Sequence, residues 1–404
     1  MIDTLAKSSL DAQTIQAFSD AAKEPQWLRA VRSEAFQRYA ALPVPGERTQ
    51  GWRRADLAGI DLQAQSEAPS PYSLLVDSRD RAVGVAVLTL ADAVRTHTDI
   101  VREALERVHR GQTLGKFSAL AESAWQEGAF IYVPPGVTLS QPIEVVSVSG
   151  PYPRLLVVLG REARACVLEV QRSAERLSCA VADLIVNDGA HLTYARVQEC
   201  AANSVVFSHQ RARLSRDAKL VTFNFGAGGR MSRADIEVEL LGPGAESDML
   251  GLISGDGAQQ FDYHTVQGHR APDTRSDLLF KSALNGTAHA VYTGVIIIEK
   301  PAQRSDAYQA NRNLLLGEGA RADTEPMLEI EANDVRCTHG ATVGPIDEEQ
   351  MFYLRSRGLS EELASRLIVE GFFEEVFQKV GDDRLTAALR SKIAPDLVAE
   401  PARA

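Results

Sequence analysis

The spacing of hydrophobic residues divides the chain into three regions. Up to about residue 127 the spacing is mainly helical, because apolar residues recur every three or four positions in two stretches. The first stretch predicts a helix over 23–42 on the positions Leu28, Val31, Ala35, Tyr39 and Leu42. The second predicts helices within 91–126, and short apolar runs near 74–76 and 83–90 lie between them. Residues 1–127 are therefore predicted to form a mixed, mainly helical region.

From residue 128 to 345 the pattern changes to many short strands. Apolar runs of four to seven residues, such as 155–159, 181–186 and 236–241, alternate with turn sequences rich in glycine, proline and asparagine. A small turn followed by alanine recurs at intervals of 27, 28 and 27 residues, at Ala163, Ala190, Ala218 and Ala245. Ala320 lies 75 residues further on, close to three more repeats of 25.

A fixed period of this size is typical of solenoid proteins. Each coil of a β-solenoid needs a small residue at its inward corner, where a larger side chain would meet the next rung, and the repeated alanine fits that position. The sequence therefore predicts a mostly β protein with a parallel β-helix of about eight coils over 128–345. The alternative is an antiparallel sandwich, which would place turns every 8 to 12 residues without a longer period.

Helical spacing returns over residues 346–404. A short helix is predicted over 347–357, and Ser360 is a suitable N-cap for a longer helix over 361–380. The longer helix is apolar over a surface wider than one packing seam needs, and this surface includes Phe372, Phe373, Val376 and Phe377. Two interpretations stay open: the helix caps the end of the solenoid, or it presents a groove to a partner protein.

Composition and charge narrow the functional classes. The 404 residues are 45% hydrophobic and 24% charged, which is ordinary for a globular protein, and the net charge of −11 disfavours nucleic-acid binding. The N-terminus lacks a signal-peptide pattern, and no run of 18 apolar residues predicts a membrane span, so we expect a cytoplasmic protein. Four cysteines without a C-x-x-C motif indicate neither a disulfide framework nor a zinc ribbon.

Cys337 and His339 are the strongest candidate ligands in the chain. Residues i and i+2 of a strand point to the same side, so the sulfur and the imidazole would face one neighbour together. A closed tetrahedral site needs four ligands, and the nearest further candidate is Asp334, so others would have to come from elsewhere, such as a second chain. The alternative is that Cys337 is a buried small hydrophobe and His339 a satisfied polar residue.

The remaining candidates are weaker. His264 and His269, five residues apart, could suit a metal, but polar residues on an outer solenoid face are commonly only solvated. Cys166, Cys179 and Cys200 lie in or beside apolar strands and are predicted to be core thiols.

Several segments together resemble the SufB/SufD family of iron–sulfur cluster assembly proteins. They are the runs 130–136, 276–281, 305–316, 329–330, 334–344 and 352–358, with a weaker match at Trp52, Arg53, Asp56 and Leu57. The stretch C-x-H-G-A-T-V-G that begins at Cys337 is similar to the SufD branch. The resemblance implies a right-handed parallel β-helix flanked by helical regions.

The resemblance also implies partners and a role. It implies pairing with a SufB-like subunit and a SufC-type ABC ATPase docked on the C-terminal helices near Phe372, Phe373, Val376 and Phe377. Whether the isolated chain forms a homodimer stays open. It implies that His339, with Cys337 as a less certain participant, shares a transient cluster or iron with a cysteine of the SufB-like subunit. A reduced flavin is implied for the complex, although no dinucleotide fingerprint occurs here.

No G-x-x-x-x-G-K-[ST] motif occurs, so we expect an assembly subunit without its own catalytic motif.

Two other functions stay open. A β-helix polysaccharide lyase or hydrolase would need clustered carboxylates, and the sequence offers only the alternating Asp235, Glu237 and Glu239. A purely structural dimer partner, with Cys337 and His339 inert, is the third alternative.

Overall fold

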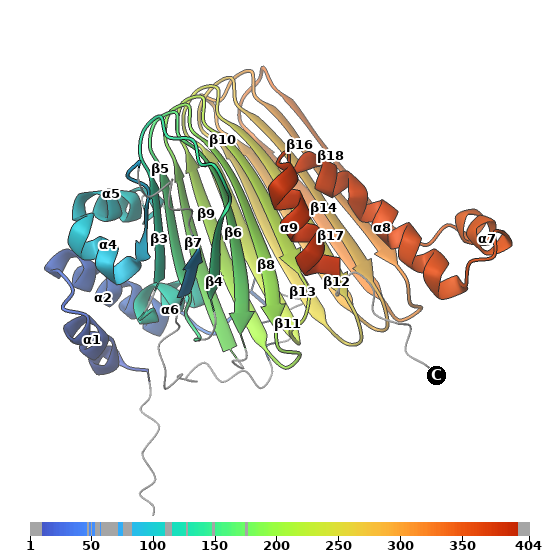
Figure 1. Ribbon diagram of the computed structural model, residues 1–404, viewed down its shortest axis with the longest axis horizontal. Helices are drawn as coiled ribbons and strands as arrows, with labels where there is room; N and C mark the ends of the chain where they lie inside the picture. The colour runs from blue at the N-terminus through green and yellow to red at the C-terminus, as the bar shows by residue number, and fades with distance from the viewer. Residues whose placement is uncertain are drawn as a thin grey trace, which may run out of the picture.

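The computed structural model describes residues 10–46, 48–49, 51–52, 57, 72–75, 83–109, 115–126, 128–147, 150–173 and 177–394. Two nine-stranded sheets face each other along the whole molecule (Figure 1). Sheet A has the strand order β1 (Tyr72–Leu75), β4 (Ile143–Ser147), β6 (Arg164–Ser173), β8 (His191–Cys200), β10 (Lys219–Gly226), β12 (Glu246–Gly255), β14 (Arg275–Leu284), β16 (Asp306–Leu315) and β18 (Arg336–Pro345).

Sheet B runs β17 (Arg321–Ile330), β15 (His289–Ile298), β13 (Gln260–His269), β11 (Met231–Leu240), β9 (Val205–Leu214), β7 (Leu177–Val186), β5 (Arg154–Leu159), β3 (Gly128–Val133) and β2 (Ala86–Thr89). Only β1 and β2 pair antiparallel among the described strands, and the others alternate between the sheets to form eight parallel coils. The predicted β-solenoid of about eight coils is confirmed, and the antiparallel sandwich is wrong.

The inward corner alanines have the predicted place. Ala163, Ala190, Ala218 and Ala245 are all fully buried, each directly before a strand of sheet A. Backbone hydrogen bonds join successive rungs there, for example from the amide of residue 219 to the carbonyl of Ala190, at 2.9 Å. A larger side chain at these positions would meet the rung above or below.

The extension of this period to Ala320 was wrong. Ala320 precedes β17 of sheet B and stacks on Ala288, whose carbonyl accepts from the amide of Arg321 at 2.9 Å. In sheet A the rungs after Ala245 instead lengthen, because Glu246 pairs with Arg275 and Arg275 with Asp306. Most strands are also ten residues long, beyond the predicted four to seven, because they continue through outward polar residues.

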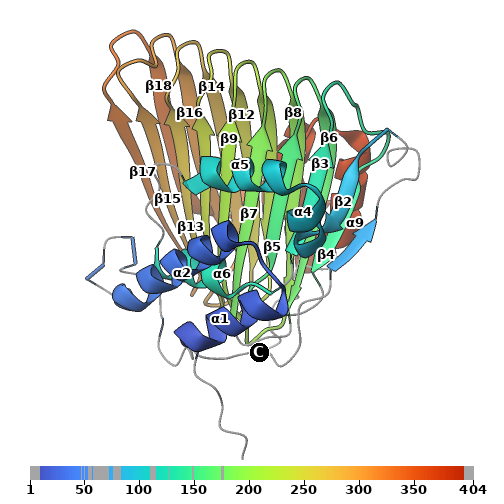
Figure 2. The ribbon, with the colours of Figure 1, turned by 90° about the vertical axis from the view of Figure 1, so that its left-hand side faces the viewer.

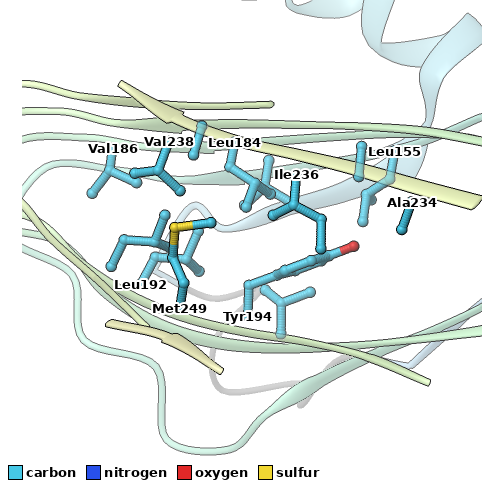
Figure 3. Close-up of a cluster of buried hydrophobic side chains, with 14 of the residues drawn as sticks. Leu155, Leu184, Val186, Leu192, Tyr194, Ala234, Ile236, Val238 and Met249 are labelled. Atoms are coloured by element: carbon cyan, nitrogen blue, oxygen red, sulfur yellow. The ribbon is translucent and has the colours of Figure 1, made fainter. Parts of the chain in front are cut away.

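The core fills the space between the two sheets. Inward side chains from both sheets meet in it, as Figure 3 shows for Leu155, Leu184, Val186, Leu192, Tyr194, Ala234, Ile236, Val238 and Met249. Because alternate residues of each strand point inward, one face of the strands from β3 to β15 belongs to this core and the other belongs to the outer surface or to the helices.

The N-terminal helices cover the outer face of sheet B over its early strands (Figure 2). They are α1 (Ala12–Ala21), α2 (Gln26–Ala41), α4 (Leu90–Thr96), α5 (Thr98–His109) and α6 (Lys116–Ala124). Trp52 packs beside Phe117 and Phe207, with the Arg233 guanidinium 3.8 Å from its ring centre, so the indole is structural. Arg53 and Asp56, which contribute to the family resemblance, lie outside the described residues.

A buried ionic cluster attaches α6 to sheet B. Glu122 of α6 pairs with Arg154 of β5 and Arg211 of β9, and Asp183 of β7 pairs with both arginines. Burial raises the pKa of Glu122, but the two guanidinium groups outweigh it and hold that pKa well below its usual value. The cluster is charge-balanced, so removing one member would leave an uncompensated buried charge.

Three helices follow the solenoid: α7 (Glu348–Ser356), α8 (Glu361–Lys379) and α9 (Asp383–Ile393). The Ser360 hydroxyl accepts from the amide of Leu363 at 3.2 Å, which confirms the predicted N-cap. Helix α8 lies along the outer face of sheet A over β12 and β14 (Figure 1), so the interpretation that it caps the solenoid end was wrong. The sequence pattern had not predicted α1 or α9.

Candidate site at the open end of the solenoid

Cys337 and His339 lie on β18, the last strand of the eighth coil. Their register partners on β16 are Ala307 and Gln309, whose side chains are buried inside the solenoid. Strands in parallel register keep the same pleat, so Cys337 and His339 occupy the inward side of the final coil. No further rung follows within the described residues, and this inward side is therefore open.

The two side chains differ in their surroundings. The Cys337 side chain is half-buried beside Ile296, Ile298 and Ala302, and this burial, with the nearby Asp306, raises the pKa of its thiol to about 11. The imidazole of His339 is exposed. In the isolated chain the thiol is thus protonated near neutral pH, while the imidazole is available to a ligand from outside.

The surface around them carries exposed apolar side chains and has free strand edges. β17 and β18 each end a sheet, so one edge of each strand has no neighbour among the described residues. Exposed large apolar side chains on these strands are Met327, Leu328, Ile330 and Val343. Exposed apolar side chains on unpaired strand edges are typical of a surface that another chain covers.

Directly beneath β18, the inward face of β16 is lined with amides. Gln309, Asn311 and Asn313 are all buried, in contrast to the apolar Leu278 and Phe280 one rung below. The Asn313 side chain donates to the carbonyl of Thr342 at 3.2 Å and so supports β18. The alternating amides of the run 305–316 had been noted in the sequence only as part of the resemblance.

The other candidate ligands are engaged elsewhere. His264 contacts Asp262 at 2.8 Å, whereas His269 is buried and bonds to Thr274 and Ser276, and burial lowers the pKa of His269 to about 4. Cys166 and Cys179 are buried, and burial raises the pKa of both thiols. Across the described residues, no group of three or more His, Cys, Asp and Glu is arranged to hold a metal ion.

The acidic residues of β11 do not form a catalytic pair. Asp235 bonds to Arg233 at 2.9 Å, Glu237 to His209 at 2.9 Å, and Glu239 to Arg270 at 2.6 Å. Each carboxylate thus has its own cationic or imidazole partner along the outer face of sheet B. This arrangement gives no support to a polysaccharide lyase or hydrolase.

The four apolar residues predicted to face a partner mostly pack inside the chain. Phe373, Val376 and Phe377 are at most 3% exposed and contact outward residues of sheet A, with the Phe377 and Phe223 ring centres 5.8 Å apart. Phe372 is partly buried against the same cluster. These four residues cannot form a docking surface while α8 packs on sheet A, because the apolar side of α8 is buried against that sheet.

The exposed apolar residues of the C-terminal region lie elsewhere. Phe352 and Tyr353 of α7 are 75% and 56% exposed, and Leu363 and Leu367 of α8 are also exposed. None of the α7 residues is buried, and this helix projects beyond the sheets (Figure 1). The sequence signal was the Met351–Leu354 apolar run in a helix with no predicted packing partner.

The fold and this site define a class: a parallel β-solenoid whose last coil is open and whose C-terminal helices carry an exposed apolar surface. Residues 144–372 match the family described as "SUF system FeS cluster assembly, SufBD core domain". The chain belongs to this SufBD family, as the resemblance predicted.

Named members of this family are similar in sequence to this chain over most of its length. It is 33% identical to the iron–sulfur cluster assembly SufBD family protein Rv1462 of Mycobacterium tuberculosis, over 79% of this chain and 85% of that one. It is 27% identical to the iron–sulfur cluster assembly protein SufD of Bacillus subtilis, covering 93% and 95%, and 25% identical to SufB of the same organism, covering 91% and 89%. These similarities do not separate the two branches. Within the described residues, no helix has the length and apolar character needed to cross a bilayer.

Proposed function

We propose that this chain is a SufD-like subunit that pairs through its open end with a SufB-like subunit in the cytoplasm. The observation that carries the proposal is the exposed His339 imidazole on the inward side of the final coil, which none of the described residues covers with a further rung. Pairing would place that imidazole between two chains. Together with a cysteine of the SufB-like subunit, it would hold iron or a nascent iron–sulfur cluster as cargo.

The ligand chemistry fits this cargo. Imidazole and thiolate are ligands of iron and of iron–sulfur clusters. This chain offers one exposed imidazole and one half-buried thiol, which is fewer than the four ligands of a closed site, so a second chain has to complete the set. Cys337 would join only after losing its proton, which a nearby metal ion favours and the apolar surroundings oppose.

The strand edges suggest how the two chains meet. β17 and β18 can extend both sheets by pairing with the edges of another solenoid, which would satisfy their free backbone groups. The same contact would cover Leu328, Ile330 and Val343. A second copy of this chain offers equal edges, so a homodimer is the expected form when the SufB-like subunit is absent.

The second partner is a SufC-type ATPase, docked on α7 and α8. Phe352, Tyr353, Leu363 and Leu367 supply an apolar surface there, and they take the place of the four buried or partly buried residues first proposed. The sequence contains no nucleotide-binding P-loop, so ATP hydrolysis belongs to the partner and this chain acts as a scaffold.

The substitution His339→Ala tests the proposal. In the complex reconstituted anaerobically with iron and sulfide, we expect it to abolish the retained iron and sulfide while leaving the melting temperature and ATPase docking unchanged, because the side chain is exposed. His191→Ala, on the outside of β8, is the matched control. Full cluster retention by His339→Ala would contradict the role of the imidazole, and retention by the isolated wild-type chain would contradict a shared site.

A further inference from the structure

Two cations lie side by side on the outer face of sheet A. Lys281 of β14 and Arg312 of β16 are register partners, so they occupy the same position on adjacent strands. Strand neighbours are about 4.8 Å apart, and like charges at this separation repel each other. Lys281 is also only 3% exposed, because α8 covers it, so its charge is removed from water.

One carboxylate from α8 bridges both cations. Glu375 accepts hydrogen bonds from Lys281 Nζ at 2.6 Å and from Arg312 Nη1 at 2.8 Å. Lys281 Nζ also donates to the carbonyl of Phe372 at 2.7 Å and lies 4.6 Å from that ring centre. Burial lowers the pKa of Lys281, and Glu375 opposes this shift. While α8 covers Lys281, Glu375 is therefore the counter-charge of a buried cation that lies beside a second, more exposed one.

The strand that carries Arg312 also supports the candidate site. Arg312 is the register partner of Thr342 on β18, and the neighbouring Asn313 donates to the Thr342 carbonyl. On the inward face of the same strand, Gln309 is the register partner of His339. β16 thus contacts α8 through its outward side chains and underlies the open end through its inward ones.

We propose that Glu375 is a regulatory link through which the position of α8 controls the order of β16 and β18 and so the readiness of the open end for its partner. A shift of α8 that turns Glu375 away while the helix still covers Lys281 leaves a buried cation beside Arg312 without its counter-charge, and the last strands loosen. Coupling between two binding surfaces is reciprocal, so occupation of the open end also holds α8 in place. This inference rests on the proposed function of the two surfaces.

The test uses two adjacent glutamates of the same helix. Glu375→Gln removes the link, whereas the control Glu374→Gln removes a carboxylate that bonds instead to Arg390 of α9, at 2.7 and 2.8 Å. In hydrogen–deuterium exchange of the isolated chain, we expect Glu375→Gln to speed exchange of residues 306–345 by about fivefold or more, a typical size for allosteric coupling. Exchange in β4 to β10 stays unchanged.

Two outcomes decide whether Glu375 links α8 to the last strands. The double variant Lys281→Met with Glu375→Gln removes the buried cation as well, so we expect exchange close to that of the wild type. Wild-type exchange in the single Glu375→Gln variant, or the same acceleration in Glu374→Gln, would overturn the link.

A second measurement adds the SufC-type ATPase. In the wild type we expect docking to change exchange of residues 336–345, and in Glu375→Gln we expect docking with unchanged affinity but without that change. The same response in both proteins would overturn the link. Failure of the wild-type chain to bind the ATPase would instead contradict the proposed function, and the exchange of the isolated variants would still test Glu375 on its own.

Discussion

Phe352 and Phe373 give opposite predictions although both are phenylalanines of the C-terminal helices. Phe352 is 75% exposed on α7, whereas Phe373 is fully buried between α8 and sheet A. If the exposed surface receives the ATPase, Phe352→Ala weakens docking without affecting the fold. Phe373→Ala affects the fold first, and any effect on docking follows from the loss of α8.

The magnitudes follow from burial. A phenylalanine buries about 200 Å² when fully covered, so docking can cover roughly 150 Å² more of Phe352, worth at most about 4 kcal/mol at about 25 cal/mol per Å². Central interface residues lose about 2 kcal/mol or more on truncation, which is roughly a 30-fold rise in Kd. Truncating a buried phenylalanine costs about 3–5 kcal/mol of folding free energy, and a surface change costs within about 0.5 kcal/mol.

The assay combines urea unfolding of each variant with titration of the ATPase subunit. Leu241→Ala is the matched control, because this residue is exposed directly after β11 of sheet B, whereas α8 packs on sheet A, and it should change neither quantity. A Phe352→Ala variant that docks within twofold of the wild type would refute the assignment of the surface to α7 and α8.

Two further predictions concern the scaffold. Ala218→Leu fills an inward corner between two buried alanines and should lower the free energy of unfolding by about 1–3 kcal/mol in urea, whereas the exposed Ala341→Leu should not, and equal effects would contradict the corner ladder. Glu122→Gln should cost about 3–5 kcal/mol at neutral pH because two buried guanidinium groups lose a counter-charge. Because the folded pKa of Glu122 lies below its unfolded value of about 4.5, its contribution is present above that pH and is lost as the pH falls through the folded pKa. The stability gap between wild type and Glu122→Gln should therefore narrow in acid, and a constant gap would refute this.

The solenoid was predictable because its cause is local and repeats. The inward corner admits only a small residue in each coil. The interval between Ala163, Ala190 and Ala218 therefore equals the length of one coil. The prediction failed where the coil length changed: Ala320 lies near a multiple of the period but belongs to the other sheet.

The use of the C-terminal helices was less predictable, because it depends on contacts between residues far apart in the chain. The apolar surface of α8 indicated a partner, and the sequence could not tell that sheet A of the same chain is that partner for Phe373 and Val376. The link from Glu375 to Lys281 and Arg312 spans 94 and 63 residues, and no local pattern indicates it.

The central claim is that the open end bearing His339 is where a SufB-like subunit completes the site. The most direct measurement is the rate at which diethyl pyrocarbonate modifies His339, followed by mass spectrometry, in the isolated chain and in the paired complex, with the partly exposed His191 as internal reference. The account predicts rapid modification of His339 in the isolated chain and strong protection on pairing, with His191 unchanged. Equal modification of His339 in both states would contradict it.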